Sequence, residues 1–255
     1  MSAAAVAAGA VAVESANTVG VITTDVTGGT YYMIGVPFES VGANSGTITF
    51  DDLIKLDGIE AYDDGDSDCP EIQVRVGNIY RMYYYITDAW DEDDKELGHD
   101  AWAFDGYECT AVDIQSLGDG FWFKAPVAAA GATITTKGQV TTNVVKTVSF
   151  AGNQKYSIIA NPFPTDVCLA DVVTTGVTAK EDGDSESAEI QVRVGNIYRM
   201  YYYITDAWDA DDNELGYDAW AFDGYECEPT DVIKAGASFW IKSYDAGNGS
   251  ITFSL

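Results

Sequence analysis

Residues 71–109 read EIQVRVGNIYRMYYYITDAWDEDDKELGHDAWAFDGYEC, and residues 189–227 repeat this stretch almost unchanged. Over 39 positions the two copies differ at only three, Glu92/Ala210, Lys95/Asn213 and His99/Tyr217. A repeat of this length and identity indicates two copies of one domain in tandem. We therefore expect an N-terminal arm over residues 1–17, a first β-domain over 18–140 and a second over 141–255.

The composition limits the classes of partner. The chain has 255 residues, 47% of them hydrophobic, which suits two domains that each bury a core. It carries 13 Lys and Arg against 41 Asp and Glu, a net charge of −28. Because phosphate binding needs clustered positive charge, this balance excludes nucleic acid and disfavours anionic membrane surfaces. We expect no membrane insertion, since the sequence has no run of about 18 apolar residues.

The repeat itself reads as a β-hairpin. Two β-branched and aromatic runs are joined by Gly77-Asn78, a dipeptide typical of a two-residue hairpin turn. Such a turn predicts three cross-strand pairs, Val76 with Ile79, Val74 with Arg81, and Ile72 with Tyr83. The opposite face also carries apolar residues, whereas a one-sided sheet alternates more cleanly. Either a bulge shifts the register or this second face packs on a neighbour.

The flanking segments complete an all-β pattern. We expect further strands at residues 18–27, 30–38, 101–109, 112–126 and 132–140, with counterparts at 144–150, 155–163, 231–243 and 250–255. A short helix is expected at 50–58 and at 168–176, because an acidic first turn and an exit glycine are typical of helix ends. The predicted fold is two tandem antiparallel β-sandwich domains related by the internal repeat, each with one short helix.

Several turn and core motifs carry a resemblance to a known class of proteins. In chain order they are Pro37-Phe38, Asp64-Gly65-Asp66, Gly118–Lys124 and Thr133–Val140. Together they resemble the uncharacterised secreted β-domain proteins of Verrucomicrobia, Lentisphaerae and Planctomycetes, over nearly all the chain after residue 17. The resemblance implies the fold and export, and it implies no catalytic residues. In layout the chain is also similar to subunits of bacterial surface filaments that polymerise by donating a terminal strand.

The N-terminal arm suits such donation. Its small residues alternate with larger ones, and the assembly residues would be Val6, Ala8, Ala10, Val11 and Val13. Small side chains let a strand enter a narrow groove, where it gains backbone hydrogen bonds and pockets for alternate residues. Head-to-tail contact of this kind need not close and forms a filament. The alternative is a residual signal peptide, because Ala10-Val11-Ala12 resembles a signal-peptidase site.

We therefore predict a structural subunit of an extracellular, pilus-like filament, a homopolymer of identical subunits at the cell surface. The alternative is a secreted tandem carbohydrate-binding module that acts as a monomer, in which aromatic residues stack on glycans. The candidate aromatic residues are Tyr83, Tyr84, Tyr85, Trp90, Trp102, Trp122 and their copies. An enzyme is not expected, since the single histidine, His99, is a tyrosine in the second copy.

Cysteines and acidic loops are the remaining candidate sites. The four cysteines fall two per half, and we favour the disulfides Cys69–Cys109 and Cys168–Cys227, with other pairings or free thiols as alternatives. No cofactor is expected except possible calcium, which prefers several oxygen ligands from one loop. The candidate ligands are Asp64, Asp66, Asp68, Asp182, Asp184 and Glu186, and solvated turn carboxylates are the alternative. Asn248 begins the only Asn-x-Ser/Thr sequon, a possible glycosylation site.

Overall fold

The computed structural model describes residues 19–39, 49–76, 79–91, 93–108, 116–194, 197–228 and 231–255. The predicted donor arm, with Val6, Ala8, Ala10, Val11 and Val13, lies outside these residues, and so does Cys109. Within them the chain is almost entirely β, and every strand pairing is antiparallel. The predicted all-β fold is confirmed.

The first half of the chain forms two sheets. A three-stranded sheet has the order β1-β9-β3, and a six-stranded sheet has the order β2-β8-β4-β5-β6-β7. Their strands are β1 (Val19–Val26), β2 (Tyr31–Gly35), β3 (Ile54–Asp57), β4 (Glu71–Val76), β5 (Ile79–Ile86), β6 (Ala101–Phe104), β7 (Tyr107–Glu108), β8 (Gly120–Lys124) and β9 (Ala132–Gln139). A core of buried side chains contributed by both sheets includes Phe50, Tyr83, Trp102 and Phe121.

The second half repeats this plan strand for strand. Its sheets have the orders β10-β20-β13 and β11-β19-β14-β15-β16-β17, with a small extra pair β12-β18. Their strands are β10 (Val145–Phe150), β11 (Lys155–Ala160), β12 (Val167–Cys168), β13 (Val173–Thr175), β14 (Glu189–Val194), β15 (Ile197–Ile204), β16 (Ala219–Phe222), β17 (Tyr225–Glu226), β18 (Val232–Ile233), β19 (Ser238–Ser243) and β20 (Gly249–Ser254). No described sheet mixes strands of the two halves.

The hairpin register follows the sequence prediction. Val76 pairs with Ile79, Val74 with Arg81, and Ile72 with Tyr83, and the pairing runs on without a bulge to Glu71 and Tyr84. Ile72 and Tyr83 point into the core. The register therefore excludes a bulge between Glu71 and Tyr84 as the cause of the mixed polarity. On the other face of the hairpin Arg75 contacts the neighbouring domain, whereas Tyr80 and Met82 are exposed, so the packing of this face on a neighbour stays a prediction.

The predicted helices are shorter than expected. Among the described residues of the first domain, α1 (Phe50–Leu53) is helical, and Thr49 caps it by accepting a hydrogen bond from the Asp52 amide at 3.3 Å. In the described part of the second domain the corresponding segment contains a 3-10 turn, η2 (Leu169–Asp171). The rest of each segment is strand, β3 or β13, because its residues alternate between the sheet faces and pair with the central strand β9 or β20.

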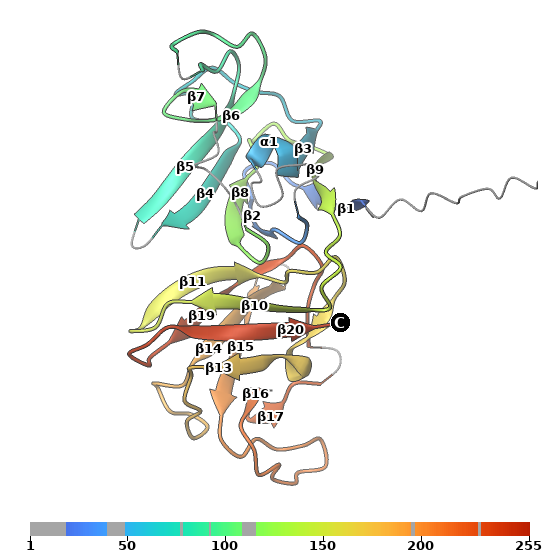
Figure 1. Ribbon diagram of the computed structural model, residues 1–255, viewed down its shortest axis with the longest axis vertical. Helices are drawn as coiled ribbons and strands as arrows, with labels where there is room; N and C mark the ends of the chain where they lie inside the picture. Colours follow the sequence, from blue (N-terminus) through green and yellow to red (C-terminus); the bar gives the residue numbers. More distant parts are fainter. Residues whose placement is uncertain are drawn as a thin grey trace, which may run out of the picture.

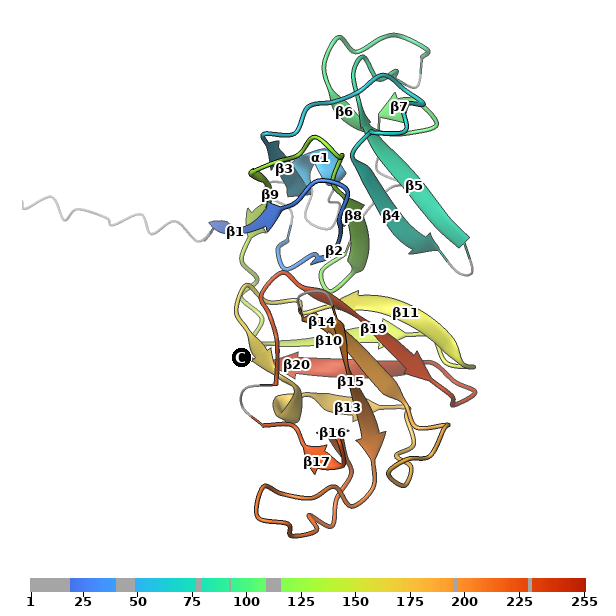
Figure 2. The ribbon, with the colours of Figure 1, turned by 180° about the vertical axis from the view of Figure 1, so that it is seen from behind.

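The two domains meet through a reciprocal pair of backbone contacts. The Gly35 amide donates to the Gly236 carbonyl at 2.9 Å, and the Ala160 amide donates to the Gly118 carbonyl at 2.7 Å. Gly35 and Ala160 occupy equivalent places before the shared Pro-Phe pairs, and Gly118 and Gly236 both lie four residues before a tryptophan. The junction therefore uses one surface from both domains, as an isologous dimer does. Figures 1 and 2 show β2 and β8 facing β11 and β19 across it.

Small residues allow this close approach. A Cβ atom at Gly35 would lie 2.5 Å from the Cβ of Ala160, and one at Gly120 would lie 2.6 Å from the Cβ of Ser238. Real side-chain atoms do not approach so closely, so the glycines are required for the two backbones to meet here. The junction is therefore tightly packed, and its geometry is set by these positions rather than by the connector between the domains.

Candidate functional site

Four aromatic rings form a continuous line across the junction. Tyr31 contacts Trp122 with ring centroids 6.2 Å apart, Trp122 contacts Trp240 at 6.3 Å, and Trp240 contacts Tyr156 at 5.8 Å. Tyr31 and Tyr156 are equivalent in the two copies, as are the two tryptophans. We call these four residues the aromatic row. It is symmetric about the junction, and both domains contribute equally to it.

The strand pleat explains why these rings face away from the core. Trp122 lies between the buried residues Phe121 and Phe123 on β8, and neighbouring residues of a strand point to opposite sheet faces. Trp240 has the same place on β19. Both tryptophans are half-buried, and Tyr31 is 39% exposed. The row is thus an accessible aromatic surface held by strands whose other face is core.

A buried carboxylate lies beside each half of the row. Glu71 is 6% exposed and lies 3.7 Å from Lys124 Nζ. Glu189 is 7% exposed and accepts hydrogen bonds from Gln191 at 3.0 Å and from the Tyr156 hydroxyl. Burial, together with this bond to Glu189, raises the pKa of Tyr156. Such partners offset the cost of burying a charge, so the carboxylates are fixed hydrogen-bonding groups at the base of the row.

Equivalent arginines reach across the junction. The guanidinium of Arg75, from the first domain, lies over the Trp240 ring at 5.8 Å from its centroid. Arg193, from the second domain, donates to the Tyr31 carbonyl. A guanidinium stacks on aromatic rings and binds carboxylates through a planar fork of donors. The row is therefore flanked by one arginine from each copy.

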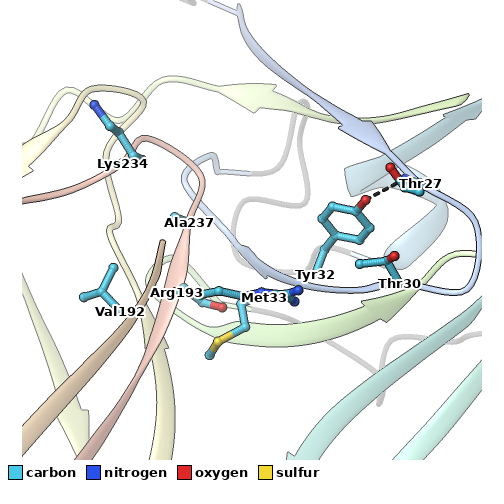
Figure 3. Close-up of a pocket in the computed structure, with 9 residues that line it drawn as sticks. Thr27, Thr30, Tyr32, Met33, Val192, Arg193, Lys234 and Ala237 are labelled. Atoms are coloured by element: carbon cyan, nitrogen blue, oxygen red, sulfur yellow. Dashed lines mark hydrogen bonds between the residues drawn. The ribbon is translucent and has the colours of Figure 1, made fainter. Parts of the chain in front are cut away.

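Each arginine also lines a pocket at the junction. The Arg193 pocket has a volume of about 540 Å³ and the Arg75 pocket about 360 Å³. Figure 3 shows Thr27, Thr30, Tyr32 and Met33 of the first domain facing Val192, Arg193, Lys234 and Ala237 of the second across the Arg193 pocket. Ser238 completes its described lining. The Arg75 pocket is lined by the opposite edge of the junction, including Lys155, Tyr156 and Asp119.

The acidic loops predicted to bind calcium form turns. Asp66 accepts a hydrogen bond from the Asp68 amide, and Asp184 accepts one from the Glu186 amide, each at 2.8 Å. These bonds from a side chain to a nearby amide are typical of turn carboxylates. In the part of the chain that the structure describes, no three His, Cys, Asp or Glu side chains are arranged to hold a metal ion. The calcium sites at Asp64, Asp66 and Asp68 and at Asp182, Asp184 and Glu186 stay predictions.

The structure corrects the predicted Cys168–Cys227 disulfide, because both residues are free thiols. The thiol of Cys168 donates to the Glu228 carbonyl at 3.4 Å, and Cys227 is buried in the core of the second domain. Cys69 is also a free thiol and donates to the Asp63 carbonyl at 3.5 Å. Its predicted partner, Cys109, lies outside the described residues. Burial raises the pKa values of the Cys69 and Cys227 thiols, so both stay protonated and unreactive.

The aromatic residues that were predicted to form one glycan-binding platform lie in separate parts of the structure. Tyr83 and Trp102 are buried in the core, whereas Trp90 is 46% exposed and belongs to a separate loop. Only Trp122 and its copy Trp240 join the row. Sequence reasoning missed Tyr31, Tyr156 and both arginines, because the cross-domain contacts that bring them together join residues distant in the chain. Asn248, the possible glycosylation site, is exposed and lines the Arg75 pocket.

No protein-family model, no curated protein and no solved structure matches this chain. The resemblance to secreted β-domain proteins therefore stays a prediction. Among the helices that the structure describes, none is long and apolar enough to cross a membrane.

Proposed function

We propose that this protein is an extracellular adhesion module that binds glycans on the aromatic row and acts by recognition, without catalysis. The observation that carries this proposal is the continuous contact of four rings across the junction, of which Tyr31 is exposed and the other three are half-buried. The C–H face of a sugar ring is apolar and packs on aromatic rings, while its hydroxyls need polar partners. The row provides the aromatic rings, and the amide, carboxylate and ammonium groups beside it provide polar partners for the hydroxyls.

We propose different roles for the rings within the row, based on their geometry. Tyr31 and Tyr156 pack edge-on against their tryptophans, at interplanar angles of 87° and 80°. The two tryptophans are tilted by 54° to each other and meet at the junction. We assign the main stacking surface to Trp122 and Trp240, and hydrogen bonding at the ends of the row to the tyrosine hydroxyls. A ligand on both tryptophans would contact both domains at once.

Replacing Trp122 or Trp240 by alanine is expected to weaken glycan binding at least about tenfold, because stacking on these aromatic rings is lost. Binding of the full chain to an array of extracellular polysaccharides would first find a ligand, and calorimetry would then compare the variants. Trp90→Ala is the matched control, since it removes an exposed tryptophan outside the row. If the array finds no ligand, or if all three variants bind alike, the glycan-binding proposal fails.

A second candidate function, a filament subunit joined through the N-terminal arm, is favoured by exposed apolar residues on the three-stranded sheets. Val19 and Val21 begin the edge strand β1, directly after the arm, and are 57% and 61% exposed. On the corresponding sheet of the second domain, Val145 and Val173 lie on the two edge strands and are 53% and 58% exposed. Unpaired edges with apolar residues accept an added strand. The junction surface is already used in both domains, so filament contacts would use these edges.

Deleting residues 2–13 tests this second candidate. Under the filament proposal the full chain forms fibres visible by negative-stain electron microscopy, and the shortened chain stays a folded monomer. Replacing Val145 and Val173 by threonine should reduce assembly too, because the acceptor edge becomes polar while its strand propensity is kept. Fibres from the shortened chain would rule out the arm as the donor strand. A full chain that remains monomeric would rule out the filament.

A further inference from the structure

The rings of the row are symmetric about the junction, but the polar groups beside them are not. In the second half of the row the Tyr156 hydroxyl donates to Glu189 and accepts a hydrogen bond from Gln191 at 3.4 Å. A hydroxyl has one proton and two acceptor sites, so these two bonds use the proton and one acceptor site. The Tyr156 end of the row therefore has little hydrogen-bonding capacity left for a ligand.

The lysine beside Tyr156 is also held by the protein. Lys242 lies opposite Tyr156 in the strand register and donates to the Tyr244 hydroxyl at 2.5 Å. Its ammonium lies over both tyrosine rings, 5.1 Å from the centroid of Tyr156 and 4.3 Å from that of Tyr244. Ring faces attract a cation, so these contacts direct the ammonium toward the protein. The second half of the row thus satisfies its own polar groups.

The first half has the same layout, but its tyrosine hydroxyl is open. Tyr31 lies opposite Lys124 in the register, and Lys124 follows Trp122 by two residues on β8, so the three side chains share one sheet face. Tyr31 contacts Trp122 through its ring and Arg193 through its carbonyl, and its hydroxyl makes no hydrogen bond within the described part of the chain. This hydroxyl keeps its proton and both acceptor sites for a ligand.

Lys124 lacks the tyrosine that holds its counterpart. Pro126 takes the place of Tyr244, two residues after the lysine, and it carries no hydroxyl. The side-chain contact that the structure describes for Lys124 is the ion pair with Glu71, at 3.7 Å, and the lysine side chain is 27% exposed. This distance is longer than a hydrogen bond, so the ammonium keeps its donors for another partner while Glu71 balances its charge.

We infer that Tyr31 and Lys124 form the subsite that selects the glycan, and that this subsite takes an uncharged sugar unit with equatorial hydroxyls. This inference rests on the proposed function. Equatorial hydroxyls project from the rim of a sugar ring and leave its faces apolar. One face therefore stacks on Trp122 while hydroxyls of the rim meet Tyr31 and Lys124. Because Glu71 balances the lysine and the chain has a net charge of −28, an uncharged sugar fits better than an anionic one.

Matched substitutions in the two halves test this inference on the full chain, with cellotetraose as the probe. Cellotetraose is an uncharged chain of β-linked glucose units whose hydroxyls are equatorial. In titrations followed by NMR, Tyr31→Phe and Lys124→Met should each raise its dissociation constant about tenfold, the loss expected for one hydrogen bond to the ligand. Tyr156→Phe and Lys242→Met make the same changes in the second half and should raise the constant about twofold or less, because their polar groups bond within the protein.

Thermal unfolding without a ligand should give the opposite order for the two tyrosines. Tyr156→Phe removes a hydrogen bond to the buried Glu189 carboxylate, so the melting temperature should fall by about 4 °C or more. Tyr31→Phe removes a hydroxyl without such a bond and should change the melting temperature by about 1 °C or less. Equal melting temperatures of the two variants would show that the two halves do not differ, and would overturn the inference.

The binding outcomes separate this inference from the function on which it rests. Equal losses of binding in Tyr31→Phe and Tyr156→Phe overturn the inference, and if Trp122→Ala still abolishes cellotetraose binding in that case, the glycan-binding function stands. Tighter binding of methyl β-D-glucuronide than of methyl β-D-glucoside also overturns it, because the preferred sugar would then be anionic. A native protein that does not bind cellotetraose overturns the inferred ligand class, and the polysaccharide array then tests the function separately.

Discussion

Replacing Phe50 by alanine is expected to lower the free energy of unfolding of the first domain by about 3–5 kcal/mol. Phe50 is fully buried, and the centroid of its ring lies 4.9 Å from that of Tyr83 and 5.5 Å from that of Phe121. It is also the first residue of α1, so it joins the helical turn to both sheets. The change removes a whole aromatic side chain from a closely packed site, and a cavity remains.

Hydrogen exchange measured by mass spectrometry would follow this loss domain by domain. Peptides from β1 and β9 report on the first domain and those from β10 and β20 on the second, and all four strands lie outside the near-identical repeat. Exchange should rise in β1 and β9 far more than in β10 and β20. Tyr80→Ala is the control, because Tyr80 is 42% exposed and its loss should change stability by about 0.5 kcal/mol or less. Equal effects of the two variants would contradict the assigned core.

Replacing Gly118 by alanine is expected to open the junction between the domains. Gly118 has a φ of +91°, and an added Cβ would lie 2.4 Å from Val148 Cγ2 of the other domain. Its carbonyl also accepts the reciprocal hydrogen bond from the Ala160 amide. Overpacking costs about 1–3 kcal/mol, and the left-handed backbone adds about 1–2 kcal/mol for any residue with a side chain.

Gly131→Ala separates these two costs. Gly131 has a φ of +71° but no atom within 4 Å of an added Cβ, so this variant carries the backbone cost alone. Urea denaturation should show a larger loss for Gly118→Ala, and proteinase K should cut the connector at residues 140–144 faster in that variant. If the two variants lose the same stability and are cut at the same rate, the contact at Gly118 does not hold the domains together.

Local signals in the sequence predicted the fold well. Gly77-Asn78 is a dipeptide typical of a two-residue hairpin turn, and the cross-strand pairs that such a turn predicts, from Val76 to Ile72, are the observed ones. The segment 50–58 was less clear, because its acidic start resembles a helix while Ile54 and Leu56 already alternate as in a strand. Residues Ile54–Asp57 pair with β9 and therefore form the strand β3 instead of continuing the helix. Here a long-range contact overrides a local preference.

The site was only partly predictable. Strand geometry predicts that Trp122 points to the face opposite Phe121 and Phe123, but all three residues are aromatic, and only the structure shows that Trp122 is the one that faces away from the core. Its contact with Trp240 depends on the junction, which forms because Gly35 meets Ala160 at a distance that no larger residue allows. These positions are more than 100 residues apart, and no local pattern relates them. The Cys168–Cys227 disulfide was predicted from the presence of two cysteines in each half, which does not show that the Cys168 thiol donates to the Glu228 carbonyl.

The reciprocal junction has a consequence for how the protein behaves on dilution. Each copy carries both halves of that interface, so a chain with one copy would have to find a second molecule to complete it. In the tandem chain five residues, 140–144, join β9 to β10. A short tether makes the association intramolecular, at an effective concentration that the dilution of the protein does not change. The pairing of the two halves, and with it the line of four rings, is thereby maintained at any protein concentration.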